Sequence, residues 1–177
     1  MKIEPKNVNK LLLPRLLTLI TSNDEGGGIS AVPSDTVIPV SSNPGMVVVT
    51  ISPAYRILQD ILSSKEFVIN VLSKDYLNKM LNCVKNYPKG IDELDQVGLN
   101  HYSSQKIKAK RVKEAMLWIE CRLVNNLKVG ENTLLVGEVV TIEAHDSVMD
   151  KGEVSLVKIN PPIRLAENNF SGMDRVA

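Results

Sequence analysis

The sequence predicts a mainly β protein of the α+β class, in which a small antiparallel barrel carries helices on its flank. About six or seven segments have the β-branched density or the alternation of strands, against two clear helices and one short one. The strands cluster without the regular strand–helix alternation that produces a doubly wound parallel sheet. Closing such a sheet into a barrel removes its exposed edges, so a barrel is the expected architecture.

Length, charge and cysteine content narrow the class of protein. We expect one domain over residues 1–177, with a loose N-terminal arm at 1–10 and a C-terminal extension at 160–177. A net charge of +1, from 21 basic and 20 acidic residues, argues against general binding to nucleic acid or membrane. Cys83 and Cys121 lie far apart without metal-binding spacing, so buried thiols are expected. Without a signal peptide or membrane span, a cytoplasmic location is the default expectation.

The N-terminal half contains the stretch around which the chain is organised. Arg15–Thr21 is predicted to be a strand, and Ser22–Gly28 a glycine-rich hairpin tip that lacks the spacing of a phosphate loop. Turn-rich pieces then bracket the short apolar run Thr36–Val40. Met46–Ser52 is predicted to be a buried strand and Pro53–Ser63 a helix. The free N–H groups at such a helix start favour an anion such as a phosphate.

The middle of the chain alternates one more strand with two helices. Glu66–Val71 is predicted to be a buried strand, and its Asn70 is expected to pair with the backbone of a neighbouring loop. Ser73 is a plausible N-cap for a helix that reaches Lys85. Ile91–Val97 is predicted to be a short acidic helix.

The last third is predicted to form the final hairpin. The basic run 106–113 alternates charged and apolar residues, which is typical of a solvated loop or edge strand. Glu114–Val124 and Thr133–Ala144 are predicted to pair, and Gly137 indicates a bulge or a close backbone approach. Lys151–Lys158 is expected to add one more strand.

Motifs for hydrolytic or metal chemistry are absent. His101 and His145 are the only histidines, and neither is expected to belong to a metal-binding cluster. Glu93 and Asp95 are two residues apart on a short helix and point in different directions, so no catalytic carboxylate pair is predicted there. Any redox or transfer chemistry would come from a bound organic cofactor, and no catalytic side chain is predicted.

Taken in order, several short motifs resemble the flavin reductase-like, FMN-binding split-barrel family of the flavoredoxin type, over residues from about 14 to about 170. The resemblance implies an antiparallel Greek-key split β-barrel with two or three flanking helices, and a homodimer that holds FMN near the subunit interface. The motifs that carry it are Ser30-Ala31-Val32-Pro33, Pro39-Val40-Ser41, Asn43-Pro44, Ile51-Ser52-Pro53, Glu66–Val71, Tyr87–Gly90 with Glu93-Leu94, Gly98-Leu99, Ile119–Arg122 and Gly137-Glu138-Val139.

The resemblance also implies a cofactor site and an activity. FMN would take hydride from NAD(P)H, or electrons from a redox protein, and pass them to an acceptor. The implied cofactor-binding residues are Ser30, Ala31, Thr36, Pro39, Val40, Ser41, Ser52, Tyr55, Arg56 and Ile57. Residues Ser30 to Ser41 of this set would lie along the isoalloxazine and ribityl chain of FMN, and residues Ser52 to Ile57 near its phosphate.

The chain departs from the family pattern at three places. Ser30 stands where Asn is usual, Asp35-Thr36 where Ser-Trp is usual, and Tyr55-Arg56-Ile57 at the usual Arg-x-Thr. Ile57 therefore lacks a hydroxyl for a phosphate, Arg56 is displaced by one residue, and an inward-facing Asp35 would repel an anion. The alternative hypothesis is a non-catalytic split-barrel relative with weakened or lost FMN binding that acts as a binding or interaction protein.

Overall fold

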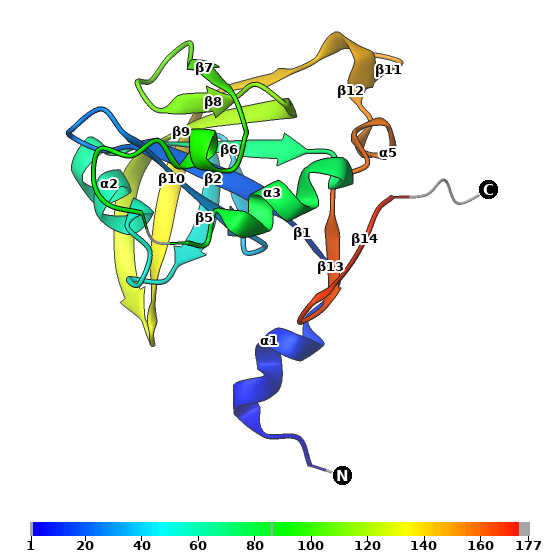
Figure 1. Cartoon of the computed structure of the whole chain (residues 1–177). Helices are drawn as coiled ribbons and strands as arrows, with labels where there is room; N and C mark the ends of the chain where they lie inside the picture. The colour runs from blue at the N-terminus through cyan, green and yellow to red at the C-terminus, as the bar shows by residue number, and fades with distance from the viewer. Residues whose placement is uncertain (1, 86, 174–177) are drawn as a thin grey trace.

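Seven strands form one antiparallel sheet that curls into a barrel. The computed structural model describes residues 2–85 and 87–173, and its sheet has the strand order β3-β2-β6-β9-β10-β5-β4 (Figure 1). The predicted fold class is confirmed. The strands are β2 (Thr18–Asn23), β3 (Ile29–Ser34), β4 (Ile38–Ser42), β5 (Gly45–Ile51), β6 (Glu66–Leu72), β9 (Ala115–Val129) and β10 (Asn132–Ala144).

The barrel closes between β3 and β5 through a side chain. Thr36, just after β3, accepts a hydrogen bond at Oγ1 from the backbone N–H of Thr50 at 3.1 Å. The same hydroxyl donates to the Thr50 carbonyl at 3.2 Å. At this point β3 and β5 are therefore joined by a threonine hydroxyl and not by backbone-to-backbone hydrogen bonds.

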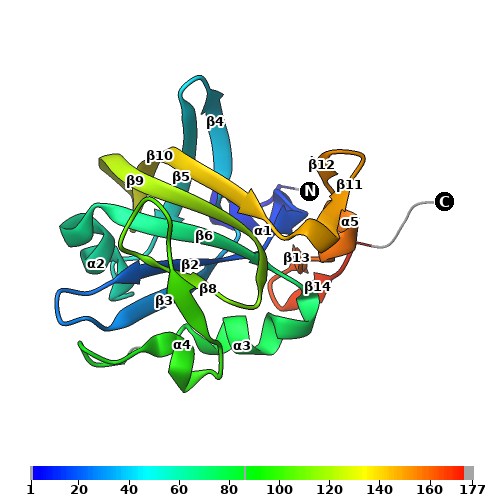
Figure 2. The ribbon, with the colours of Figure 1, turned by 90° about the horizontal axis from the view of Figure 1, so that it is seen from above.

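Three helices flank the sheet, namely α2 (Ile57–Ser64), α3 (Leu77–Asn82) and α4 (Glu93–Gln96) (Figure 2). Helix α2 begins four residues later than predicted, because the N–H of Tyr55 closes a turn on the carbonyl of Ser52 at 3.1 Å. Ser73 caps a 3₁₀ turn, Lys74–Tyr76, which leads into α3. The other helical segments are Pro5–Asn7, α1 (Val8–Leu11), Asp146–Val148 and α5 (Leu156–Ile159).

Three small sheets complete the fold. One of them joins segments that are far apart in the sequence: β1 (Arg15–Leu16) pairs with β13 (Ile163–Ala166), and β13 pairs with β14 (Asn169–Ser171). The prediction of a strand over 151–158 is wrong for most of that range, because Ser155 caps α5. The remaining pairs are β7 (His101–Ser103) with β8 (Lys110–Val112) and β11 (Met149–Asp150) with β12 (Glu153–Val154).

Apolar side chains fill both faces of the curled sheet. Leu19 and Ile20, neighbours on β2, belong to different core clusters because successive strand residues point to opposite faces. Gly137 lies at a register shift between β9 and β10, as predicted, and a Cβ there would lie 2.5 Å from Cζ of Phe67. Burial raises the pKa of the Cys83 thiol to about 12, and Cys121 is likewise a buried thiol.

The expectation of a solvated basic run is wrong at Arg111. Its side chain is fully buried, and its Nε donates to Oε1 of Glu120 at 2.7 Å. Asn70 pairs with backbone groups as predicted, but they belong to strands and not to a loop: its side chain accepts from the N–H of Val112 on β8 and donates to the carbonyl of Leu19 on β2, both at 2.9 Å. These contacts fix β8 against the barrel.

Among the described helices, none is long and apolar enough to cross a membrane.

Candidate functional site: a cleft beside the end of β3

A cleft of about 420 Å³ opens where β3 ends, between α3 and the β13–β14 hairpin. Its lining combines apolar side chains and the rings of Tyr55 and Phe170 with the charged Asp35, Arg164 and Glu167. A hollow of similar size, about 430 Å³, has Ala109 as its single apolar lining residue. Ligand sites combine apolar walls with a few convergent polar groups, so the first cleft is the candidate. It is lined by Leu17, Pro33, Asp35, Tyr55, Leu77, Asn78, Leu81, Val84, Arg164, Glu167, Asn168 and Phe170.

Of the residues implied by the family resemblance, Tyr55 lines this cleft, and Asp35 joins it there. Ser30 and Ala31 are buried in the barrel. The side chain of Ile57, 2% exposed, packs in the core instead of facing a phosphate. Substituting a hydroxyl-bearing residue at 57 would therefore bury a polar group and not repair a binding site.

The other implied residues lie outside the cleft. Thr36 uses its hydroxyl to close the barrel, and Ser52 is half-buried in the turn before α2. Pro39, Val40 and Ser41 are exposed on β4, in the hairpin that projects from the barrel (Figure 2). The structure therefore places these strand residues at the surface, outside the cleft.

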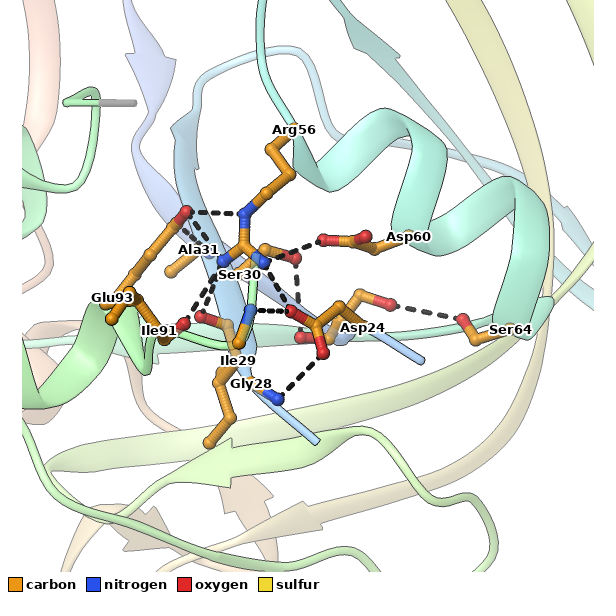
Figure 3. Close-up of polar contacts among 12 residues, drawn as sticks. Asp24, Gly28, Ile29, Ser30, Ala31, Arg56, Asp60, Ser64, Ile91 and Glu93 are labelled. Atoms are coloured by element: carbon orange, nitrogen blue, oxygen red, sulfur yellow. Dashed lines mark hydrogen bonds and ion pairs between the residues drawn. The ribbon is translucent and has the colours of Figure 1, made fainter. Parts of the chain in front are cut away.

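Arg56 is the centre of a buried ion cluster (Figure 3). Its Nη1 lies 2.6 Å from Oδ2 of Asp24, and its Nη2 lies 2.9 Å from Oε1 of Glu93. Its Nη2 also donates to the carbonyls of Ile29 and Ile91, both at 3.3 Å. With its side chain 11% exposed, Arg56 holds the β2–β3 hairpin, the start of α2 and α4 together. The guanidinium of Arg56 is thus bonded to these partners, and its implied role as a cofactor contact stays a prediction that this geometry does not favour.

The two main carboxylates of the cluster have different pKa values. Burial favours a neutral Asp24, but hydrogen bonds from the N–H groups of Gly90 and Gly28 to its carboxylate outweigh this, so the pKa of Asp24 is lowered. Burial raises the pKa of Glu93, although the N–H of Ala31 and the guanidinium of Arg56 favour its charged form. The lowered pKa favours the charged form of Asp24 as the partner of Arg56.

The charged residues that line the cleft are Asp35, Arg164 and Glu167, and Asp35 is paired with two arginines. Oδ2 of Asp35 lies 3.1 Å from Nη2 of Arg15 and 3.0 Å from Nη1 of Arg164. Two guanidiniums therefore surround one carboxylate, and Asp35 does not present an unbalanced negative charge. Sequence reasoning missed Arg164 and Phe170, because both come from the C-terminal extension, and no local motif connects them with β3.

The fold and the cleft define the class of protein as an antiparallel split barrel with a pocket between its main sheet and a terminal hairpin. Residues 11–160 match the flavin reductase like domain, and the chain belongs to this family. An uncharacterized protein of Pyrococcus abyssi is 30% identical over 147 residues, which cover 83% of this chain and 84% of that protein.

Two solved structures have the same fold. Nitrilotriacetate monooxygenase component B from Bacillus cereus superposes with a TM-score of 0.89 at 24% identity, covering 99% of this chain and 96% of that one. Flavoredoxin from Methanosarcina acetivorans gives a TM-score of 0.85 at 22% identity, covering 100% of this chain and 94% of that one. Family membership implies a flavin cofactor and flavin-related redox chemistry.

The residues of the cleft fit a flavin. A flat isoalloxazine needs an apolar, partly aromatic wall, which Tyr55, Leu77 and Phe170 supply. A flavin phosphate needs a cation at the edge of the site, and Arg164 stands there with its side chain 31% exposed.

Proposed function

We propose that the chain is an FMN-binding flavin reductase-like oxidoreductase that passes electrons from NAD(P)H or a redox protein to an acceptor. The observation that carries the proposal is the cleft, whose lining combines aromatic and apolar side chains with the partly exposed guanidinium of Arg164 in a chain of this family. Bound FMN would supply the hydride or electron transfer.

The side chains of the cleft have binding roles. Tyr55 and Phe170 would pack against the flavin ring, and Leu81 would exclude water from it. Arg164 would take the phosphate, because its side chain is 31% exposed although it is paired with Asp35, whereas the side chain of Arg56 is 11% exposed and lies between Asp24 and Glu93. The charge of Arg164 also favours FMN over the uncharged riboflavin.

A homodimer is part of the proposal. Large apolar side chains are exposed on the projecting β4 and on the outer half of β9, and such surfaces mark interaction sites. Pairing two copies through these strands would cover them and bring Pro39, Val40 and Ser41 of one subunit towards the other. The exposed apolar residues are Ile38, Val40, Val124, Leu127 and Val129.

The burial of Arg56 and Ile57 favours a second candidate function. With neither side chain available at the start of α2, a barrel that has lost FMN would act as a binding or interaction protein. In the first candidate function Arg164 binds the flavin phosphate in place of Arg56 and Ile57, and in the second no residue does.

The absorption spectrum tests the proposal. We expect the purified chain, mixed with FMN and then desalted, to retain the visible bands of the flavin and to oxidise NADH or NADPH. A folded chain that stays colourless and leaves FMN fluorescence unchanged would refute the proposal and favour the second candidate. Sedimentation of the wild type and of Leu127→Glu tests the dimer, and we expect the variant to be monomeric.

A further inference from the structure

The fold brings three metal-ligating side chains together at the outer end of α4, away from the residues that line the cleft. One ligand atom each from Asp92, Asp95 and His101 lies within 4.8 Å of the other two. Nε2 of His101 is 2.9 Å from Oδ2 of Asp92. The sequence predicted that neither histidine belongs to a metal-binding cluster, and the structure brings His101 together with two carboxylates.

The backbone around the cluster is held in place without a metal. Oδ1 of Asp92 accepts the N–H groups of Leu94 and Asp95, at 2.9 and 3.3 Å, and so caps α4. This leaves Oδ2 of the same carboxylate directed at His101. Helix α4 is itself fixed by the buried ion pair of Glu93, and β7 by its pairing with β8. Two elements therefore present their ligands to one point in a fixed geometry.

The cluster has no cationic partner that would satisfy it. Within residues 2–85 and 87–173, no Lys or Arg nitrogen forms an ion pair with Asp92 or Asp95, and the one basic group that contacts Asp92 is the imidazole of His101. The half-buried Asp92 and the exposed Asp95 therefore lie side by side without a lysine or arginine partner among these residues. A bound divalent cation would neutralise them.

We propose that Asp92, Asp95 and His101 form a binding site for a divalent transition metal ion such as Zn²⁺, with water in the remaining positions. One imidazole and two carboxylates are ligands that Zn²⁺ accepts in tetrahedral sites. The imidazole favours a transition metal over Mg²⁺ or Ca²⁺, which take oxygen ligands. The bound ion would link the start of α4 to β7.

Other residues compete poorly for the same ion. Burial raises the pKa of the thiols of Cys83 and Cys121, so neither supplies the thiolate that zinc binds. The second histidine, His145, has its Nδ1 2.8 Å from the hydroxyl of Ser147. His145 therefore provides the matched control for His101.

Calorimetric titration of the chelator-treated chain with ZnCl₂ tests the site. We expect one saturable site in the wild type and in His145→Gln, and a loss of affinity of at least about tenfold in His101→Gln and in Asp95→Asn. Zn²⁺ should raise the Tm of the first two proteins and leave that of the last two unchanged, whereas Mg²⁺ should shift none of them.

Two results would overturn the site: no saturable Zn²⁺ binding to the wild type, or equal affinity of the wild type and His101→Gln. His101 and Asp95 are both exposed, so their variants are expected to fold, and far-UV circular dichroism checks this. The test requires no flavin and stands independently of the proposed redox function.

Discussion

Nη1 of Arg56 lies 2.6 Å from Oδ2 of Asp24, and the two side chains are 11% and 1% exposed. Because residues 24 and 56 belong to different elements, this contact ties the β2–β3 hairpin to the start of α2. Glu93 extends the tie to α4. The arginine that family resemblance placed near a phosphate thus holds the scaffold on which Tyr55 enters the cleft.

Replacing Arg56 by Met should strongly destabilise the fold. The substitution leaves Asp24 and Glu93 buried without a cation, which costs about 3–5 kcal/mol when one partner of a buried pair is removed. Urea unfolding at neutral pH measures the change. Arg122→Met, at an exposed position on β9, is the control and should cost less than about 1 kcal/mol. A similar small cost for both variants would mean that the cluster is not a structural tie.

The stability contributed by Asp24 should depend on pH in a defined direction. Its pKa is lowered in the folded state by hydrogen bonds from backbone N–H groups that outweigh burial, so its contribution is complete above the unfolded pKa of 3.8 and is lost as the pH falls through the folded pKa. The destabilisation caused by Asp24→Asn should therefore be largest near neutral pH and shrink below about pH 4. Urea unfolding across this range tests it, and a pH-independent difference would contradict the assignment.

Gly137→Ala should destabilise the barrel, because the new Cβ would lie 2.5 Å from the ring of Phe67 in the core. Overpacking of this kind costs about 1–3 kcal/mol. Gly45→Ala is the matched control, since a Cβ there meets Val139 at an ordinary 3.5 Å. Thermal unfolding should show a lower Tm for Gly137→Ala and an unchanged Tm for Gly45→Ala. Equal Tm values would mean that the ring of Phe67 moves aside without cost.

Arg164→Gln should weaken binding of FMN and leave binding of riboflavin nearly unchanged. Loss of one charge-assisted hydrogen bond corresponds to about 1.5–3 kcal/mol, or at least about tenfold in affinity. Fluorescence titration of both ligands against the wild type and the variant gives the ratio. Because the substitution also removes an ion pair with Asp35, a purely structural effect would weaken both ligands equally and contradict the phosphate assignment.

Local sequence features predicted much of the fold. Gly137 marked a strand irregularity and Asn70 a buried polar contact, because both depend on strand geometry that is visible in the neighbouring residues. The site was less predictable. Arg164 meets Asp35 across 129 positions of sequence, and Arg56 finds Glu93 across 37. Contacts of this kind form only when the chain closes, so the sequence could not assign them.

The same limit explains Arg111. Its charge placed it at the surface in the prediction, but Glu120 on β9 lies within 2.7 Å and lets the guanidinium be buried. Ile57 is the opposite case. Its apolar side chain is typical of a core position, which is where it lies, whereas the family resemblance implied a position near the phosphate.

Titration of FMN against the wild type and Tyr55→Ala, followed by flavin fluorescence, tests most directly whether flavin binds in this cleft. We expect the wild type to bind saturably and the variant to lose affinity by about tenfold or more, because the ring of Tyr55 forms part of the wall. Tyr87→Ala, outside the cleft, should bind like the wild type. Saturable binding that is equal in all three proteins would place the flavin elsewhere and contradict the account.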